Sequence, residues 1–290
     1  MTSEAQKQTA SAFGYQWHQR NAVEDPGFAS HARDWLYKQF GEVRTAPWLK
    51  GKMLDAGCGA GYSALQMFGE ALNQVDYLGV DISNSIEVAE QRFKERGVKG
   101  RFMQADITNL PLPKDHFDVA ISNGVLHHTD STEVALKAVA SHVKPDGRFL
   151  FYVYRKKSPV REFTDDYVRG LLQGMTPEQA WEAVKPLTKL GIALGELDID
   201  ITIPEDVPLL GIPAGKMNLQ RFFYWHFCKA FYRADYEFDG MHLINFDWYA
   251  PKNAHRQSPE QVRQWCAEAG LAIEREFIDE AGIAIIARRT

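Results

Sequence analysis

Short apolar runs alternate with helical patterns through the middle of the chain. The predicted strands are 52–56, 77–80, 101–105, 117–122 and 148–153. The predicted helices between them cover 60–72, 85–96 and 131–143. Strands that alternate with crossover helices pair in parallel, so this stretch predicts a doubly wound α/β sheet.

The elements at both ends extend this pattern. Asp25 and Pro26 form an N-cap and first-turn pair that predicts a helix to about Phe40, after a polar N-terminal arm. Asp130 with Glu133 predicts a capping box where a later helix begins, and the turn 144–147 ends that helix. The closing elements are a helix over 258–269 and a hairpin of strands 271–278 and 282–288.

The alternation is interrupted before these closing elements. Segment 154–257 has three helical patterns instead, at 159–172, 177–190 and 219–232. A segment of this length predicts an inserted subdomain rather than a loop. We therefore expect an N-terminal arm and helix (1–50), a doubly wound core (51–153), an inserted subdomain (154–257) and a final helix with its hairpin (258–290).

A glycine-rich turn follows the first predicted strand. Gly57, Gly59 and Gly61 lie between that strand and the next helix, and Asp81 ends the second strand. Glycines let the backbone approach a ligand closely, and an acid at that strand end accepts both hydroxyls of a ribose. These residues predict a nucleoside cofactor.

The residues around the turn indicate which nucleoside cofactor it binds. Its spacing is GxGxG, whereas dinucleotide folds have GxGxxG, and a P-loop ending is absent. Asp55 lies just before the first glycine, where a carboxylate opposes a phosphate but favours ammonium and sulfonium charges. S-adenosylmethionine carries both charges and no phosphate, so it is the predicted cofactor.

Five stretches in order resemble the class I S-adenosylmethionine-dependent methyltransferases over about 51–153. They are DAGCGAG, YLGVDIS with Asp81, QADITNLPL with Asp106, FDVAISNGVLHH and HVKPDGRFLF. The resemblance implies a seven-stranded Rossmann-like methyltransferase sheet, Asp81 as the ribose-binding acid, Asp106 in the adenine-contacting turn, and S-adenosylhomocysteine as product. Asp106 is alternatively a turn-capping residue.

The ends of the chain carry a finer resemblance. AFGYQW and FDWYAPKNAHRQSPEQVRQWCAEAGL are similar to a bacterial methyltransferase subgroup with an FGYxW arm, which implies that the arm folds over the cofactor. Ile82 and Ile107 either sandwich the adenine or belong to the core. The predicted cofactor-binding residues are Asp55, Gly57, Gly59, Gly61, Asp81, Ile82, Asp106, Ile107, Asn123, Tyr15 and Trp17.

Asn123 ends the fourth strand, where a parallel sheet presents ligand groups. Gly124 follows it, so the NPPY motif of amino-methylating DNA enzymes is absent. His127 and His128 are the candidate catalytic pair, because a histidine of near-neutral pKa removes a proton as a methyl group arrives. The alternatives are a histidine that is hydrogen-bonded at the next helix start, and a reaction that needs only placement of the acceptor.

Aromatic side chains gather in the insert. Phe223, Phe227 and Phe231 fall four apart and predict one core-packed helix face, whereas Trp225 and Tyr232 point elsewhere and line a pocket or a partner surface. Polar residues before the last helix favour substrate contact. The predicted substrate-binding residues are Tyr224, Asp247, Tyr249 and His255. His242 and His255 have no second ligand at helical or hairpin spacing, so no metal is expected.

Composition and charge limit the partners and the cellular location that we expect. The net charge of -5 gives no broad positive field, so nucleic acid is an unfavoured partner. Three cysteines without CxxC spacing argue against disulfides and structural zinc, and we expect a cytoplasmic protein without a membrane span or secretion signal. The insert is a candidate homodimer surface.

The sequence thus predicts an enzyme, an S-adenosylmethionine-dependent methyltransferase that acts by in-line displacement. Its acceptor is expected to be a small or medium-sized molecule enclosed by the aromatic lid. The alternatives are a methyltransferase acting on tRNA or protein, and a non-catalytic S-adenosylmethionine-binding protein. Acidic residues of the insert argue against a basic docking face, namely Glu196, Asp198, Asp200, Glu205 and Asp206.

Overall fold

The computed structural model describes residues 3–18 and 26–290, which divide into two compact units. The core unit comprises 3–18, 30–155 and 253–290, and the insert unit comprises 26–29 and 156–252. Asp25, the predicted N-cap, lies outside the described residues. Among the described residues, no helix combines the length and the apolar character that crossing a membrane requires.

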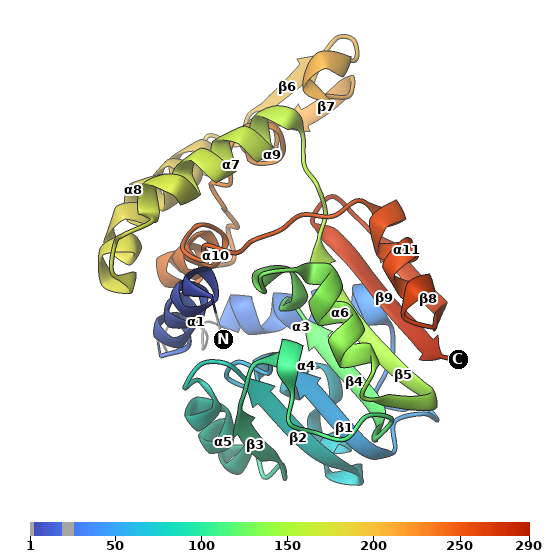
Figure 1. Ribbon diagram of the computed structural model, residues 1–290. Coiled ribbons are helices and arrows are strands. Elements are labelled where there is room, and N and C mark those ends of the chain that lie inside the picture. Colours follow the sequence, from blue (N-terminus) through green and yellow to red (C-terminus); the bar gives the residue numbers. More distant parts are fainter. Residues whose placement is uncertain (1–2, 19–25) are drawn as a thin grey trace. The chain divides into compact units, whose positions relative to one another are not determined.

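A seven-stranded mixed sheet forms the middle of the core unit (Figure 1). In spatial order its strands are β3 (Arg101–Gln104), β2 (Val75–Asp81), β1 (Gly51–Ala56), β4 (Phe117–Asn123), β5 (Val143–Tyr154), β9 (Gly282–Arg289) and β8 (Leu271–Ile278). Pairing is parallel from β3 to β5, and β9 is antiparallel to both of its neighbours. The predicted doubly wound sheet and closing hairpin are confirmed.

Helices cover both faces of this sheet. One face packs against α6 (Thr132–Ala140) and α11 (Pro259–Glu268), and the other against α3 (Pro26–Phe40), α4 (Tyr62–Phe68) and α5 (Ile86–Glu95). Met53 and Leu54, adjacent in β1, belong to the cores on opposite faces. This alternation places apolar side chains on both sides of each central strand. Short 3-10 helices are η1 (Gly69–Gln74), η2 (Ile107–Asn109), η3 (Leu126–His128) and η4 (Pro208–Leu210).

The N-terminal arm contains a helix that the sequence pattern did not predict. Helix α1 (Glu4–Trp17) is capped by Ser3, whose side chain accepts a hydrogen bond from the backbone of Gln6. Its buried face is mostly polar or small, so hydrophobic periodicity does not reveal it. That face consists of Gln6, Thr9, Ala12, Gly14 and Gln16.

The capping box predicted near Asp130 is wrong. Ser131 is the N-cap of α6, and its side chain accepts from the backbone of Val134, so Glu133 does not complete a box. The helix ends at Ala140, earlier than predicted, because the next residues join the sheet. The predicted turn 144–147 lies within the long strand β5, where the pairing with β4 shifts in register.

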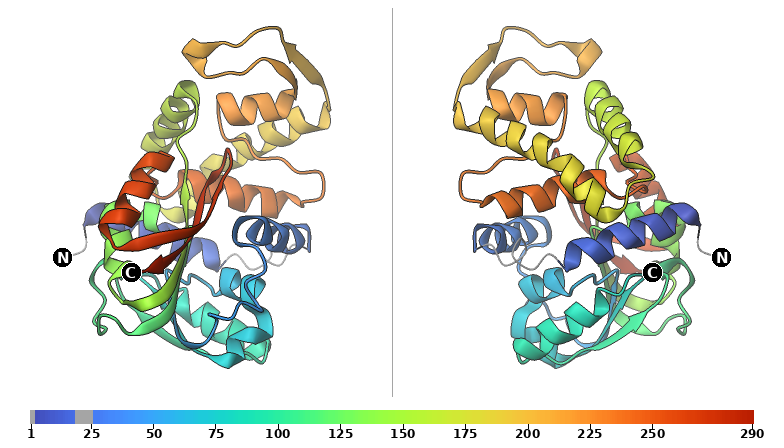
Figure 2. Two further views of the ribbon diagram at one scale, coloured as in Figure 1. Left: turned by 90° about the vertical axis from the view of Figure 1, so that its right-hand side faces the viewer. Right: turned by 90° about the vertical axis from the view of Figure 1, so that its left-hand side faces the viewer.

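The insert unit is mostly helical (Figure 2). Its elements are α7 (Pro159–Leu172), α8 (Pro177–Glu196), β6 (Asp200–Ile203), β7 (Gly215–Asn218), α9 (Leu219–His226) and α10 (Phe238–Tyr249). The sequence pattern missed the β6–β7 hairpin and α10. It also predicted α9 too long, so the expected Phe223–Phe227–Phe231 face is wrong. Phe231 lies beyond the helix, and Tyr224 is the buried aromatic of α9.

Close packing of α8 gives a first prediction. A Cβ at Gly191 would lie 2.7 Å from the carbonyl oxygen of Ala230, whereas a Cβ at Gly170 of α7 would meet nothing within 4 Å. We expect Gly191→Ala to lower the free energy of unfolding by about 1–3 kcal/mol through overpacking. Gly170→Ala should raise it by about 0.5–1 kcal/mol through helix propensity. Urea denaturation followed by tryptophan fluorescence measures both, and equal shifts would contradict this packing.

Candidate functional site

Polar residues lie at the carboxyl ends of neighbouring strands. Asp55 lies near the end of β1, Asp81 and Asn123 end β2 and β4, and Asp106 follows β3. These four strands are adjacent and parallel, so their carboxyl ends meet at one edge of the sheet. Ligands of open α/β sheets bind at this edge. The structure therefore brings together the four predicted polar cofactor-binding residues.

The glycine-rich turn after β1 is held by its own backbone hydrogen bonds. The N–H groups of Gly57 and Cys58 donate to one carbonyl oxygen of β2, at 2.7 and 2.9 Å. Gly59 donates to the Asp81 carboxylate at 2.9 Å, and Gly61 donates to the carbonyl of Cys58 at 2.8 Å. A pyrophosphate needs N–H groups that point at it. Since these four donate within the protein, the turn favours a ligand without phosphate.

The glycines of the turn are also required by close contacts. Gly57 and Gly61 have φ of 89° and 73°, in the left-handed region. A Cβ at Gly57 would lie 2.2 Å from the side chain of Val125, and one at Gly61 would lie 2.8 Å from Phe93. Both positions therefore exclude larger residues through packing and backbone conformation alike.

The carboxylate of Asp81 is fixed in orientation. One oxygen accepts from the Gly59 backbone at 2.9 Å, and the other accepts from the backbone and hydroxyl of Ser83 at 2.8 and 2.7 Å. Oδ1 of Asp81 thus accepts two hydrogen bonds and Oδ2 accepts one, so a lone pair of Oδ2 remains for another donor. A carboxylate held in this way fits a ligand that donates a hydrogen bond from a hydroxyl group, such as a ribose.

Asp106 acts as the cap of η2. One of its oxygens accepts from the backbone and hydroxyl of Thr108 at 2.9 and 2.7 Å. Its other oxygen makes no hydrogen bond to the described residues. Ile107 belongs to the buried core, whereas Ile82 is half-buried. Of the two predicted adenine-sandwiching isoleucines, only Ile82 retains accessible surface for a base.

Asn123 presents a buried acceptor. Its side-chain nitrogen donates to the Ser63 hydroxyl at 3.1 Å, while its side-chain oxygen has no hydrogen-bond partner among the described residues. A buried acceptor without a partner costs free energy, which a ligand donor would recover. An ammonium group supplies such a donor, so Asn123 fits the amino acid part of the predicted cofactor.

Asp55 is buried in the first strand. Tyr77 donates to its carboxylate at 2.6 Å. Burial raises the pKa of Asp55 to about 7, although the Tyr77 hydrogen bond lowers it and the charge of Asp81 raises it further. A cation bound nearby would stabilise the ionised form. Asp55 is therefore suited to a positively charged ligand.

Helix α1 packs against the turn. A Cβ at Gly59 would lie 3.0 Å from the indole nitrogen of Trp17. The ring of Phe13 meets the ring of His128 edge-on, with centroids 4.8 Å apart, and Tyr15 is half-buried. The structure thus places the predicted arm residue Trp17 beside the predicted cofactor-binding turn.

Both candidate histidines are buried. The His127 ring lies 3.8 Å from the ring of Tyr154, centroid to centroid, at a tilt of 35°. His128 Nδ1 lies 2.6 Å from the carbonyl oxygen of Asn253. The backbone of Asn253 donates to the Thr9 hydroxyl at 3.1 Å. His128 is therefore tied to the segment that holds α1 in place.

Sequence reasoning missed the residues that hold α1. The hydroxyl of Ser3 and the side-chain amide of Asn253 both donate to one oxygen of Asp130, at 2.7 and 2.9 Å. No local pattern marks this contact, because its residues lie in three distant segments. Asp130 lies at a predicted helix start, but Ser3 lies in an arm where no helix was predicted, so the sequence contains little signal for this contact.

The predicted substrate-binding residues are divided between the units. Tyr249 is fully buried in the insert unit, and its hydroxyl donates to Asp165 at 2.7 Å. Tyr224 is buried and Asp247 half-buried in the same unit. His255 is exposed in the core unit. The described residues contain no group of three or more acidic, histidine or cysteine side chains that could hold a metal.

Comparisons with known proteins agree with this geometry. Residues 54–151 match the family described as "Methyltransferase domain". The uncharacterized methyltransferase YcgJ of Bacillus subtilis (strain 168) is 34% identical over 135 residues, which cover 46% of this chain and 51% of that protein. The ubiquinone/menaquinone biosynthesis C-methyltransferase UbiE of Azotobacter vinelandii is 36% identical over 110 residues, 37% of this chain and 44% of the relative. The chain spans about half the length of these curated relatives.

One solved structure shares the fold along the whole chain. Magnesium protoporphyrin IX methyltransferase (ChlM) from Synechocystis PCC 6803, solved with bound SAH, is 15% identical, with a TM-score of 0.51 and 98% of both chains covered. Together with the family match, the sheet order and the glycine turn define the class. The chain contains a class I methyltransferase domain, whose methyl donor is S-adenosylmethionine.

The fixed carboxylate of Asp81 gives a second prediction. Asp81→Ala should weaken S-adenosylmethionine binding at least about tenfold, because a hydrogen bond from the ribose to a charged acceptor is lost. Asp76→Ala is the matched control on the same strand, since Asp76 pairs with Arg101 at the surface. Isothermal titration calorimetry should find the control within about twofold of wild type. Asp81→Ala within the same range would contradict the ribose assignment.

The pKa of Asp55 gives a third prediction. That pKa is raised to about 7, so the carboxyl gains its charge as the pH rises through neutrality. We expect affinity for S-adenosylmethionine to increase several-fold between about pH 6 and pH 8, because the ionised carboxylate attracts the sulfonium. S-adenosylhomocysteine lacks that charge and should show a smaller increase. If Asp55→Asn kept the full increase, another group would be responsible.

Proposed function

We propose that the whole chain is an S-adenosylmethionine-dependent methyltransferase whose acceptor is a small or medium-sized molecule. The observation that carries the proposal is the fixed Asp81 carboxylate beside a glycine turn with internally satisfied N–H groups. Both features suit a nucleoside that carries no phosphate. The residues proposed to hold the donor are Asp55, Gly57, Gly59, Gly61, Asp81, Ile82, Asp106, Asn123, Tyr15 and Trp17, with Ile107 behind them in the buried core.

Methyl transfer requires mainly that the protein position the acceptor and the donor correctly. The donor supplies an electrophilic methyl group on a sulfonium, which an in-line nucleophile accepts at close range. Asp81 would hold the ribose and Asn123 the amino acid part, which fixes the direction of the methyl group. His127 and His128 remain the candidates to accept a proton from the acceptor. Their burial suits one of them to a site from which water is excluded.

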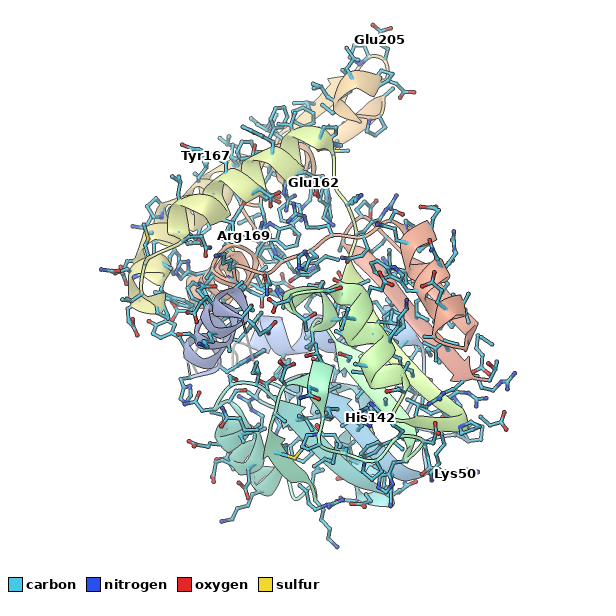
Figure 3. The ribbon with its side chains drawn as sticks, in the orientation of Figure 1. Lys50, His142, Glu162, Tyr167, Arg169 and Glu205 are labelled. Carbon is cyan, nitrogen blue, oxygen red and sulfur yellow. The ribbon has the colours of Figure 1, made fainter. Side chains whose placement is uncertain are left out.

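The surface of the insert supports a small acceptor. The five acidic residues at 196–206 are all exposed around the β6–β7 hairpin, and Glu205 lies at its tip (Figure 3). An exposed acidic region repels the phosphates of RNA. The relatives named above include enzymes of quinone biosynthesis and porphyrin methylation, whose names specify small molecules.

The arm and the insert are the proposed closing elements. Membership of the FGYxW subgroup would give α1 a general role over the cofactor, which the contact of Trp17 with the turn supports. The aromatic insert would enclose the acceptor. An exposed apolar row on α7, made of Phe163, Tyr167 and Leu171, would supply a homodimer surface.

The proposal is tested with S-adenosylmethionine labelled in its methyl group. The protein is incubated with separate small-molecule, RNA and protein fractions of a cell extract, and Asp81→Ala serves as the control without donor binding. We expect label in small molecules with wild type only. Label in RNA or protein alone would contradict the acceptor class. Donor binding without label in any fraction would favour the non-catalytic alternative.

A further inference from the structure

Tyr77 of β2 lies on the same face of the sheet as Asp55 of β1. It pairs in register with Met53 and belongs to the same buried core, and Asp55 follows Met53 by two residues. Alternate residues of a strand share a face, so Met53 and Asp55 point the same way. The Tyr77 hydroxyl donates to the Asp55 carboxylate at 2.6 Å. The core of the sheet is thereby joined to the residue just before the glycine-rich turn.

This hydrogen bond is the one that the Asp55 carboxylate accepts from the described residues. Asp55 is 4% exposed and Tyr77 is 2% exposed, so the hydroxyl takes the place of water at that carboxylate oxygen. Within residues 3–18 and 26–290, Asp55 forms no salt bridge. Arg92 of α5 reaches the turn, but it donates to the carbonyl oxygen of Ala60 at 2.7 Å. A buried carboxylate with one neutral donor is incompletely stabilised as an anion, and a bound cation would complete it.

The titratable groups around Asp55 differ in their effect on its charge. Burial raises the pKa of Asp55 most, and the like charge of Asp81 raises it further. Cys58 in the turn stays a neutral thiol, because burial and the charges of Asp55 and Asp81 raise its pKa well above the usual range. Tyr77 also stays neutral, since burial and Asp55 raise its pKa. Of these three neighbours, only the Tyr77 hydroxyl lowers the pKa of Asp55.

The ring of Tyr77 packs independently of its hydroxyl. Its centroid lies 4.9 Å from that of the Phe93 ring and 5.9 Å from that of the Phe102 ring. A phenylalanine side chain fills almost the same volume, so Tyr77→Phe removes the hydroxyl and retains these contacts. The effect of the hydroxyl on Asp55 can therefore be measured apart from the packing of the ring.

We propose that Tyr77 is a positioning residue of the donor site, which holds the Asp55 carboxylate as an anion and thereby sets the preference for the sulfonium donor over its thioether product. The inference rests on the proposed function, because it takes Asp55 as a donor-binding residue. The sulfur of S-adenosylmethionine is positively charged, whereas that of S-adenosylhomocysteine is neutral. An anion inside the protein distinguishes the two ligands by charge, since the local dielectric is low. A donor preferred in this way displaces the product after transfer.

Tyr77→Phe tests the proposal by calorimetric titration with both ligands. We expect affinity for S-adenosylmethionine to fall at least about threefold near pH 7 and to recover most of this loss by about pH 9, because Asp55 then ionises at higher pH. Affinity for S-adenosylhomocysteine should stay within about twofold of wild type, because its sulfur is uncharged. Tyr37→Phe, which removes an exposed hydroxyl from α3, is the matched control and should bind both ligands as wild type does.

The same substitution in an Asp55→Asn background shows through which residue the hydroxyl acts. Asp55→Asn alone should remove the preference for the sulfonium and its increase with pH. Adding Tyr77→Phe should then change the affinity for S-adenosylmethionine by less than about twofold, since the coupled partner has lost its charge. A further loss of several-fold would mean that Tyr77 acts elsewhere, and would overturn the proposal.

A purely structural hydroxyl gives a different result. It would weaken both ligands equally at every pH, or lower the melting temperature without changing the preference, and either outcome overturns the proposal. Failure of Tyr77→Phe to fold would do the same. If Asp55→Asn keeps the wild-type preference, the assignment of Asp55 to the donor site fails, and this inference fails with it. The titrations need no acceptor, so absence of methylated product contradicts the proposed function and leaves the role of Tyr77 standing.

Discussion

The hydrogen bond from the Gly59 backbone to the Asp81 carboxylate determines the shape of the cofactor edge. It joins the turn after β1 to the end of β2, and the parallel register that pairs Ala56 with Val80 brings the two together. The same carboxylate binds Ser83, so its orientation is set before any ligand arrives. The position of Trp17 against Gly59 depends in turn on this turn conformation.

The insert unit depends on a different interaction, the buried pair of Arg161 and Asp165. Asp165 also accepts from the Tyr249 hydroxyl and from the Lys229 backbone, so one carboxylate joins α7, α10 and the segment between α9 and α10. The negative charge of Asp165 is balanced by Arg161. The ammonium of Lys229 lies over the neighbouring ring of Trp248, 4.6 Å from its centroid.

The candidate site was predictable to the extent that its residues lie near one another in sequence. Asp55 and the glycines form one motif, and Asp81 follows at the end of the next strand, so spacing alone revealed them. The hydrogen bonds that fix α1 were not predictable, because Asn253 and Asp130 belong to segments far from α1 in the sequence. The aromatic face of α9 was misassigned because the helix ends at His226, and no strong stop residue follows.

The sequence by itself determined the alternation of strands and helices, the class of sheet and the chemistry of its cofactor edge. Two-residue and helical periodicities are local, and so is the glycine spacing that a tight turn requires. Only the tertiary structure decided which charges lie close together inside the insert unit. Lys157, Lys229 and Trp248 are far apart in the chain, and their proximity and burial arise from the packing of α7, α9 and α10. The cost of a buried charge depends on its neighbours in space, which no local pattern specifies.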